Sequence, residues 1–279
     1  MNQGSIVAWL FFTLSPAFTA ADQICLGSGP QTPRDISQKF GTNTSSFNLA
    51  PSYRDMNLCN IHTHTFAEHK GPGFSISANN GQTDGFRCND TAGLSQEELT
   101  DPTHGSGAFQ GVSPGDTIEV HWVYSSCAVQ PGQGLGSCFS AACANPQLRV
   151  EAQVFLLVDD PYALNFQTMV YGNTVIDGRH QAKALPTHTG TPIVFAGSTT
   201  GPKYTAKKCS PYQVTWSVRP NCAKLNIASL HNWAADGNIF NESHSHGVRA
   251  LVTEPELLAP INLKPSAYIA VWAALSASW

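Results

Sequence analysis

Two short segments of the chain place histidines and a glutamate at alternate positions. The first contains His62 and His64, and the second contains Glu119 and His121 in a run rich in β-branched residues. Alternate side chains of a β-strand share one face, so the members of each pair point the same way, roughly 7 Å apart. If the two strands pair, three imidazoles converge on one point. Three neutral histidines with an open fourth position are typical of a catalytic zinc site rather than a structural one.

Polar neighbours of these histidines support this interpretation. A metal-bound histidine usually donates its second ring N–H to an outer acceptor, which fixes the tautomer. Asn60 precedes His62 by two positions, as Glu119 precedes His121. The alternative is a set of core or surface histidines satisfied by backbone carbonyls, and a lone His-x-His pattern favours that alternative. The combination with Glu-x-His in a second strand favours a zinc (Zn2+) site.

The composition indicates a fold built from strands and loops. Only 12% of the 279 residues are charged, and the chain has 23 glycines and 18 prolines. We predict a mainly β protein, a single domain around a large, mostly antiparallel β-sheet with few short helices. The net charge is −4 and no basic run occurs, which argues against nucleic acid or an anionic membrane as a partner. The clearest predicted strands cover 116–124, 147–158, 191–196, 213–218 and 267–273.

The first residues have the composition of an export signal. The run 6–14 is almost wholly apolar but too short to span a bilayer, and small residues follow up to Ala21. We predict a signal peptide over 1–21 and one domain over 22–279, so that the protein is secreted or periplasmic. The apolar run 268–275 is also too short for a membrane span and predicts a final buried strand.

The cysteines predict disulfides. An even number of them in an exported chain allows up to four bridges, and spacing alone leaves the pairing open. Thiolate zinc ligands are the alternative, which the lack of any Cys-x-x-Cys pair disfavours. All of them follow the predicted cleavage point: Cys25, Cys59, Cys88, Cys127, Cys138, Cys143, Cys209 and Cys222. Glycosylation sequons, relevant only in a host that uses them, begin at Asn43, Asn89 and Asn241.

Five short motifs occur in a fixed order along the chain. They are Asn60-Ile61-His62-Thr63-His64, Glu68-His69, Glu119-Val120-His121, Gly197-Ser198-Thr199-Thr200 and Val214-Thr215-Trp216. Each motif is weak alone, but the ordered set is specific. With these motifs the chain resembles carbonic anhydrases of the alpha-like architecture, and most closely the delta-class and delta-like proteins. The resemblance runs from about residue 57 to the C-terminus.

The resemblance implies a role for the matching polar residues near the histidines. His62, His64 and His121 would be the zinc ligands. Glu119 would accept a hydrogen bond from His121, and Asn60 would stand behind His62 where the alpha class has glutamine.

The resemblance also implies the groups that act on the substrate. Thr200 would accept a hydrogen bond from a zinc-bound hydroxide, and Glu68 would accept one from Thr200. A shift of the match by one residue would give this role to Thr199, so both threonines stay open. His69 would be a buried structural histidine. The apolar pocket for carbon dioxide would be lined by Val123, Val150, Val214 and Trp216.

The chain departs from the alpha-class pattern in its spacing. The connection from His64 to Glu68 is much shorter, and the connection from His64 to His121 is far longer, because 70–115 intervene. The interval from Thr200 to Trp216 is also longer. These differences bear on the shape of the pocket and on the choice of threonine more than on the three ligands.

The implied function is zinc-dependent hydration of carbon dioxide to bicarbonate by a zinc-bound hydroxide, with a small molecule as substrate. The alternatives are another secreted zinc hydrolase of the esterase type and a non-catalytic metal-binding protein on the same scaffold. A zinc peptidase is disfavoured because no His-Glu-x-x-His occurs. Each turnover releases a proton, which histidine is suited to carry. Spacing selects none of the candidates, which are His104, His180, His188, His231, His244 and His246.

Overall fold

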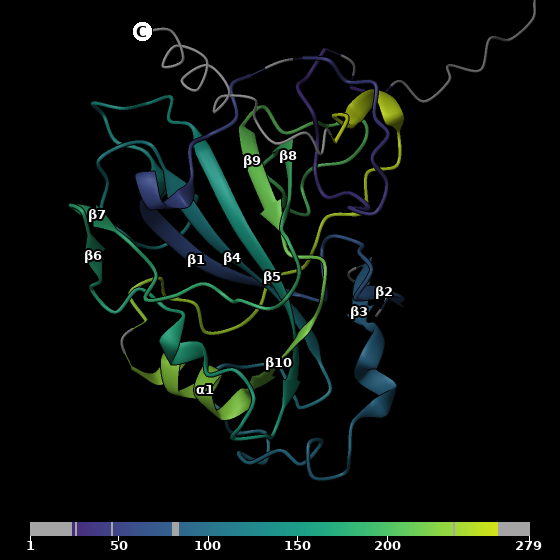
Figure 1. Ribbon diagram of the computed structural model, residues 1–279, viewed down its shortest axis with the longest axis vertical. Helices are drawn as coiled ribbons and strands as arrows, with labels where there is room; N and C mark the ends of the chain where they lie inside the picture. The colour runs from purple at the N-terminus through teal and green to yellow at the C-terminus, as the bar shows by residue number, and fades with distance from the viewer. Residues whose placement is uncertain (1–23, 26, 46, 80–83, 237, 262–279) are drawn as a thin grey trace, which may run out of the picture.

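The fold is mainly β, as the sequence predicts. In the computed structural model, the described residues are 24–25, 27–45, 47–79, 84–236 and 238–261 (Figure 1). The predicted signal peptide over 1–21 and the predicted strand over 267–273 lie outside these residues. Among the described residues, no helix is long and apolar enough to cross a membrane.

One large sheet organises the molecule. Its six strands are β1 Asn57–Thr65, β4 Thr117–Ser125, β5 Leu148–Val158, β8 Ile193–Ser198, β9 Gln213–Val218 and β10 Ala223–Asn226. Two small antiparallel pairs accompany it, β2 Phe74–Asn79 with β3 Asp84–Cys88 and β6 Val175–Ile176 with β7 Arg179–His180. The α-helix α1 spans Ile227–Ala235, and 3-10 turns cover η1 Tyr53–Asp55, η2 Asn89–Gly93, η3 Leu135–Cys138, η4 Phe166–Thr168 and η5 Pro255–Leu257.

The sheet is mixed rather than purely antiparallel. Its order is β1-β4-β5-β9-β8, with β10 also paired to β5. The pairs β1/β4, β4/β5 and β8/β9 are antiparallel, whereas β5 pairs in parallel with both β9 and β10. Parallel neighbours need a long crossover between them. The chain between β5 and β9 supplies this crossover. The central strand β5, which has neighbours on both sides, is buried along nearly its whole length.

The register of the sheet aligns the polar positions of neighbouring strands. His62 on β1 pairs with His121 on β4, and His121 pairs in turn with Ala152 on β5. Paired residues share a face and lie close together. The small side chain of Ala152 therefore adjoins the two imidazoles on one face of the sheet.

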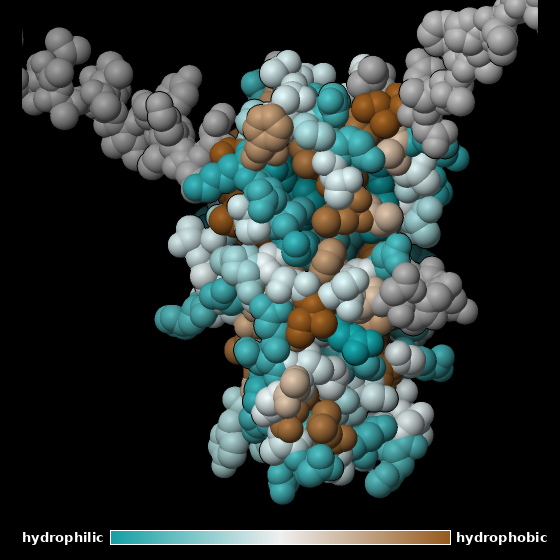
Figure 2. All heavy atoms as spheres, turned by 90° about the vertical axis from the view of Figure 1, so that its right-hand side faces the viewer, coloured by the Kyte–Doolittle hydropathy of each residue, from teal (hydrophilic) through white to brown (hydrophobic). Residues whose placement is uncertain are grey.

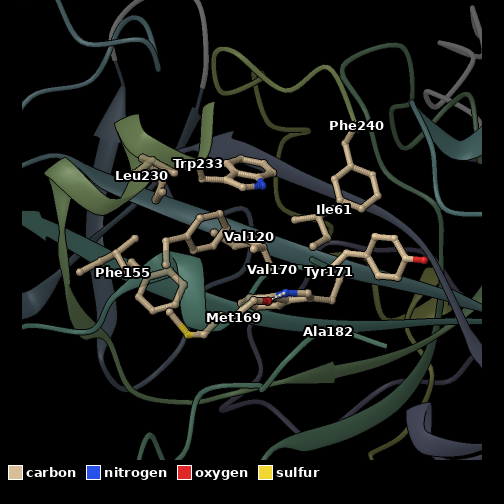
Figure 3. Packing of buried hydrophobic residues seen from close by; sticks show 14 of the residues in the cluster. Ile61, Val120, Phe155, Met169, Val170, Tyr171, Ala182, Leu230, Trp233 and Phe240 are labelled. Atoms are coloured by element: carbon tan, nitrogen blue, oxygen red, sulfur yellow. Dashed lines mark hydrogen bonds between the residues drawn. The ribbon is translucent and has the colours of Figure 1, made fainter. Parts of the chain in front are cut away.

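The opposite face of the sheet carries a second apolar core. Ile61, Val120 and Trp122 point into it from β1 and β4, where α1 and the segment around Met169 cover them (Figure 3). The helix begins at Asn226, whose side chain accepts a hydrogen bond from the backbone N–H of Ser229. Its buried apolar side chains, spaced for one helix face, are Ile227, Leu230 and Trp233.

The surface seen on the β2–β3 side shows small hydrophobic patches separated by hydrophilic residues (Figure 2). Among the described residues, every cysteine is paired, in the bridges Cys25–Cys209, Cys59–Cys138, Cys88–Cys222 and Cys127–Cys143. The predicted disulfides are thus present, and they indicate folding in an oxidising compartment.

Candidate metal centre

Three imidazoles meet on one face of the sheet, between β1 and β4. The ring centres of His62 and His121 lie 5.0 Å apart, those of His62 and His64 lie 5.1 Å apart, and those of His64 and His121 lie 4.7 Å apart. One ring nitrogen of each residue lies within 4.8 Å of the other two. The convergence predicted from the alternation is present in the structure.

The outer hydrogen bonds of two rings decide which nitrogens face the centre. Nδ1 of His62 donates to Oδ1 of Asn60 at 2.8 Å, and Nε2 of His121 donates to Oε1 of Glu119 at 3.0 Å. The remaining nitrogens, Nε2 of His62 and Nδ1 of His121, lie 3.2 Å apart. Two nitrogens bound to one tetrahedral zinc at about 2.0–2.1 Å would lie about 3.3 Å apart. The spacing therefore fits one shared metal ion.

His64 completes the set of donors. Its side chain is buried, and neither ring nitrogen has a hydrogen bond of ordinary geometry, although the backbone of Gly247 approaches the ring. A buried polar atom without a partner is costly unless something binds it. Burial, together with the neighbouring imidazoles, lowers the pKa of His62 and His64, and burial also lowers that of His121. Neutral imidazoles are the form that binds zinc.

Glu119 fixes this group from behind. Its carboxylate accepts hydrogen bonds from the ring of His121, from Nδ1 of His69 at 2.8 Å, and from the backbone N–H groups of Glu68 and His69. Burial alone raises the pKa of Glu119, but these histidines and their hydrogen bonds hold it well below its usual range. His69 is fully buried and packs against Trp216, with the ring centres 4.8 Å apart and the rings tilted by 59°. The carboxylate is therefore ionised and held in place.

The three imidazoles open into a cavity of about 600 Å³. Its apolar wall follows the sheet, because Val123 on β4 pairs with Val150 on β5, which pairs with Trp216 on β9. Asn60 on β1 lies at the end of the same row, opposite Val123. Val214, two residues before Trp216, also lines the cavity. All of the pocket residues expected from the sequence therefore surround one space.

Both candidate threonines line the cavity, but they have different partners. The hydroxyl of Thr199 lies 2.5 Å from that of Ser210, so it is engaged away from the histidines. The side chain of Thr200 interacts with the carboxyl of Glu68 and lowers its pKa. Burial first, and then the charge of Glu119, outweigh that contact and raise the pKa of Glu68 to about 8. Oε2 of Glu68 makes no ordinary hydrogen bond.

The rim of the cavity holds Glu242, a residue for which the sequence predicts no role, beside His246. The segment around His246 runs beside β1, with its backbone N–H donating to Thr63 and its carbonyl accepting from Thr65. Nε2 of His246 lies 3.2 Å from Oε2 of Glu242, which raises the pKa of the histidine. The one signal in the sequence is the His-x-His alternation at 244–246. Of the predicted proton carriers, His244 and His246 line this cavity.

Comparison with known proteins identifies the family. Residues 53–229 match the family model for delta carbonic anhydrase. Among solved structures, an alpha-carbonic anhydrase of Photobacterium profundum is 18% identical, covering 78% of this chain and 85% of its own, with a TM-score of 0.26. The alpha-carbonic anhydrase of Thermovibrio ammonificans, solved with sulfanilamide, is 14% identical, covering 78% and 83%, with a TM-score of 0.27. A search of curated proteins gave no match.

Both structural likenesses are distant, and the assignment depends on the family model alone. That model spans more than half of the chain and includes β1, β4, β5 and β9, the strands that carry the three histidines and the apolar wall. The chain belongs to the delta carbonic anhydrase family.

Proposed function

We propose that the protein hydrates carbon dioxide to bicarbonate at a zinc ion held by His62, His64 and His121. The observation that carries this proposal is the group of three inward-facing imidazoles at the base of a cavity with an apolar wall. Zinc bound there would lower the pKa of a coordinated water to about 7 and so supply a nucleophile at neutral pH, an effect for which carbonic anhydrase is the standard example.

Glu119 and Asn60 are proposed to hold two of the ligands in the tautomers that the metal needs. Each accepts the outer N–H of its histidine, so the other nitrogen keeps a free lone pair. The negative charge of Glu119 also makes His121 a more basic donor. Removing such outer partners typically weakens metal affinity about 10- to 100-fold.

Thr200 and Glu68 are proposed to orient the attacking oxygen. A threonine hydroxyl that donates its proton to Glu68 can only accept from a second group. Oγ1 of Thr200 would therefore accept a hydrogen bond from the attacking oxygen and so turn a lone pair of that oxygen toward the substrate. This requires Glu68 to be ionised, and a metal dication at the three histidines favours the ionised form.

The apolar row of Val123, Val150 and Trp216 suits an uncharged substrate. Carbon dioxide offers no charge for the protein to pair, so its binding depends on exclusion of water beside the reacting centre. The proton released in each turnover must leave through the same cavity. His244 and His246 lie at its rim, where a histidine that titrates near neutrality can pass the proton to solvent.

We also propose that residues 1–21 direct export, so that the protein is secreted or periplasmic. The four disulfides support this proposal, because such bonds persist in oxidising compartments.

Carbon dioxide hydration by the purified chain, followed by stopped flow, tests the proposed function. We expect a rapid reaction that a zinc chelator abolishes and added zinc restores. Hydrolysis of a simple ester and of a peptide, measured on the same sample, separates the alternatives. Zinc-dependent ester or peptide hydrolysis without carbon dioxide hydration would identify a different zinc hydrolase, and bound zinc without any of these reactions would identify a non-catalytic carrier.

A further inference from the structure

The strand that carries two of the three histidines is interrupted just before them. The register of β1 against β4 shifts between Leu58 and Asn60, so Cys59 is the extra residue of a β-bulge. A bulge leaves one residue outside the ladder and re-aims the side chains beside it. Here Cys59 and Asn60 both lie on the cavity side, whereas Leu58 and Ile61 lie in the opposite core.

A loop from a distant part of the chain is anchored at this bulge. Its residues 132–138 return to β1 after β4 has ended. The backbone N–H of Gly132 donates to the carbonyl of Cys59 at 3.0 Å, and the hydroxyl of Ser137 donates to the same carbonyl at 2.6 Å. The disulfide Cys59–Cys138 closes the attachment. The same loop forms one side of the cavity through Gln133, Gly134 and Leu135.

The side-chain amide of Asn60 connects this loop to His62. Nδ2 of Asn60 donates to the carbonyl of Gly132 at 2.9 Å, and a carbonyl can only accept. The amide is therefore oriented with Oδ1 toward His62, whose Nδ1 must carry the proton that forms the 2.8 Å hydrogen bond. The opposite nitrogen, Nε2, is left with its lone pair directed at His121 and the centre.

We propose that the Cys59–Cys138 bridge and the loop it holds are the positioning device of the zinc site. Gly132 sets the orientation of Asn60, Asn60 sets the tautomer of His62, and the bridge keeps Gly132 in place. Cys59, Cys138 and Ser137 are positioning residues, since none of them belongs to the three histidines or to the cavity wall. The inference depends on the proposed zinc site but not on the reaction performed there.

Zinc affinity of bridge variants tests this inference. The full-length chain is prepared with Cys59→Ala and Cys138→Ala together, and the matched control carries Cys88→Ala and Cys222→Ala, which removes a bridge whose cysteines do not line the cavity. Competition with a chelator of known affinity measures zinc binding. We expect the first variant to bind zinc about tenfold more weakly and the control to stay within about twofold of the unmodified chain. Equal losses in the two variants would overturn the proposal.

A double-mutant cycle distinguishes this route from general loosening of the fold. Asn60→Ala alone should weaken zinc about 10- to 100-fold. If the bridge acts through Asn60, its removal from the Asn60→Ala chain should weaken zinc by no more than about a further twofold. A second full tenfold loss in the combined variant would contradict the proposed path.

Ser137→Ala keeps the inference testable if the cysteine variant does not fold. This substitution removes the hydroxyl that contacts the carbonyls of Cys59 and Gly134, and Ser140→Ala, two residues beyond the loop, is its control. We expect about threefold weaker zinc binding for Ser137→Ala and no change for the control; equal affinities would overturn the proposal. Zinc binding by the unmodified chain without carbon dioxide hydration would instead overturn only the proposed function.

Discussion

The two faces of β1 and β4 are both buried, but one carries apolar side chains and the other carries polar ones. One face presents Ile61, Val120 and Trp122 to a dry apolar core, where side-chain packing is the main interaction. The other presents His62, His64 and His121 to a cavity, where hydrogen bonds to Asn60 and Glu119 orient two of the three rings. Consecutive residues of one strand thus serve the two purposes in alternation.

The cross-links are distributed just as unevenly. Cys59, Cys88, Cys127 and Cys138 all belong to the hydrophobic cluster on the cavity side, and the core on the other face contains no cysteine among its described residues. An apolar face stabilises itself by burial. A face that must hold polar groups in fixed positions gains less stability from apolar burial. Covalent bridges compensate for that smaller stabilisation.

The largest expected difference between the faces comes from substituting two residues of β1 that lie on opposite faces, His64 and Ile61. His64→Ala removes a proposed ligand and should reduce bound zinc to near zero, with carbon dioxide hydration falling more than about a hundredfold. Ile61→Ala, on the opposite face, should lower the free energy of unfolding by about 3 kcal/mol and leave one zinc per chain. Metal analysis and denaturant unfolding of both variants check this. Full zinc occupancy in His64→Ala would remove that residue from the ligand set.

Within the cavity face, the two threonines should behave differently. Thr200→Ala should slow carbon dioxide hydration about a hundredfold without loss of zinc, because the hydroxyl orients the attacking oxygen rather than the metal. Glu68→Ala should act similarly, and the two losses should not add if both residues form one relay. Thr199→Ala, whose hydroxyl pairs with Ser210, is the control. A large defect in Thr199→Ala alone would transfer the role to that residue.

Glu68 predicts a pH dependence of stability for the metal-free chain. Its pKa is raised to about 8 in the folded protein, mainly by burial, from a usual value near 4.5. Its contribution to stability is therefore complete below about pH 4.5 and is lost as the pH rises through 8. Glu68→Gln mimics the protonated form, so its free energy of unfolding should equal that of the unmodified chain below pH 4.5 and exceed it by about 4 kcal/mol at pH 8. Equal stabilities at pH 8 would show that the carboxyl is ionised without cost.

The smallest expected signal is that of a thiol titration, because a chain with all four bridges has no free thiol to react. Thiol titration of the denatured, unreduced protein should detect fewer than about one free thiol per chain if all four bridges form. Reduction in denaturant should release the thiols of all four bridges. Free thiols throughout the exported, unreduced chain would contradict the uneven cross-linking of the two faces.

The strands that carry the site are the best-predicted part of the fold. β9 has the predicted bounds, and β4 and β5 begin one residue after theirs. These segments alternate polar and apolar residues or run fully apolar, and burial of a face enforces that pattern. β8 lies two residues later than the predicted 191–196, because Gly197 and Ser198, which lack strand propensity, pair with β9.

Features that depend on distant contacts could not be predicted from the sequence. The bulge at Cys59 leaves the alternation of 60, 62 and 64 intact, so it has no sign in the pattern. The parallel pairings of β5 and the partners of the cysteines depend on how crossovers fold back. Glu242 was visible only as part of a glycosylation sequon, although it pairs with His246 at the cavity rim. The positions of the three histidines follow from local spacing in the sequence. The contacts that hold them in place come from remote segments.

The most direct test is a titration of the metal-free protein with zinc, followed by its rate of carbon dioxide hydration. We predict a linear rise in rate that stops at one zinc per chain, with no activity before zinc is added. A rate that stays at the uncatalysed value throughout the titration, or a break at two zinc ions per chain, would contradict a single catalytic site at His62, His64 and His121.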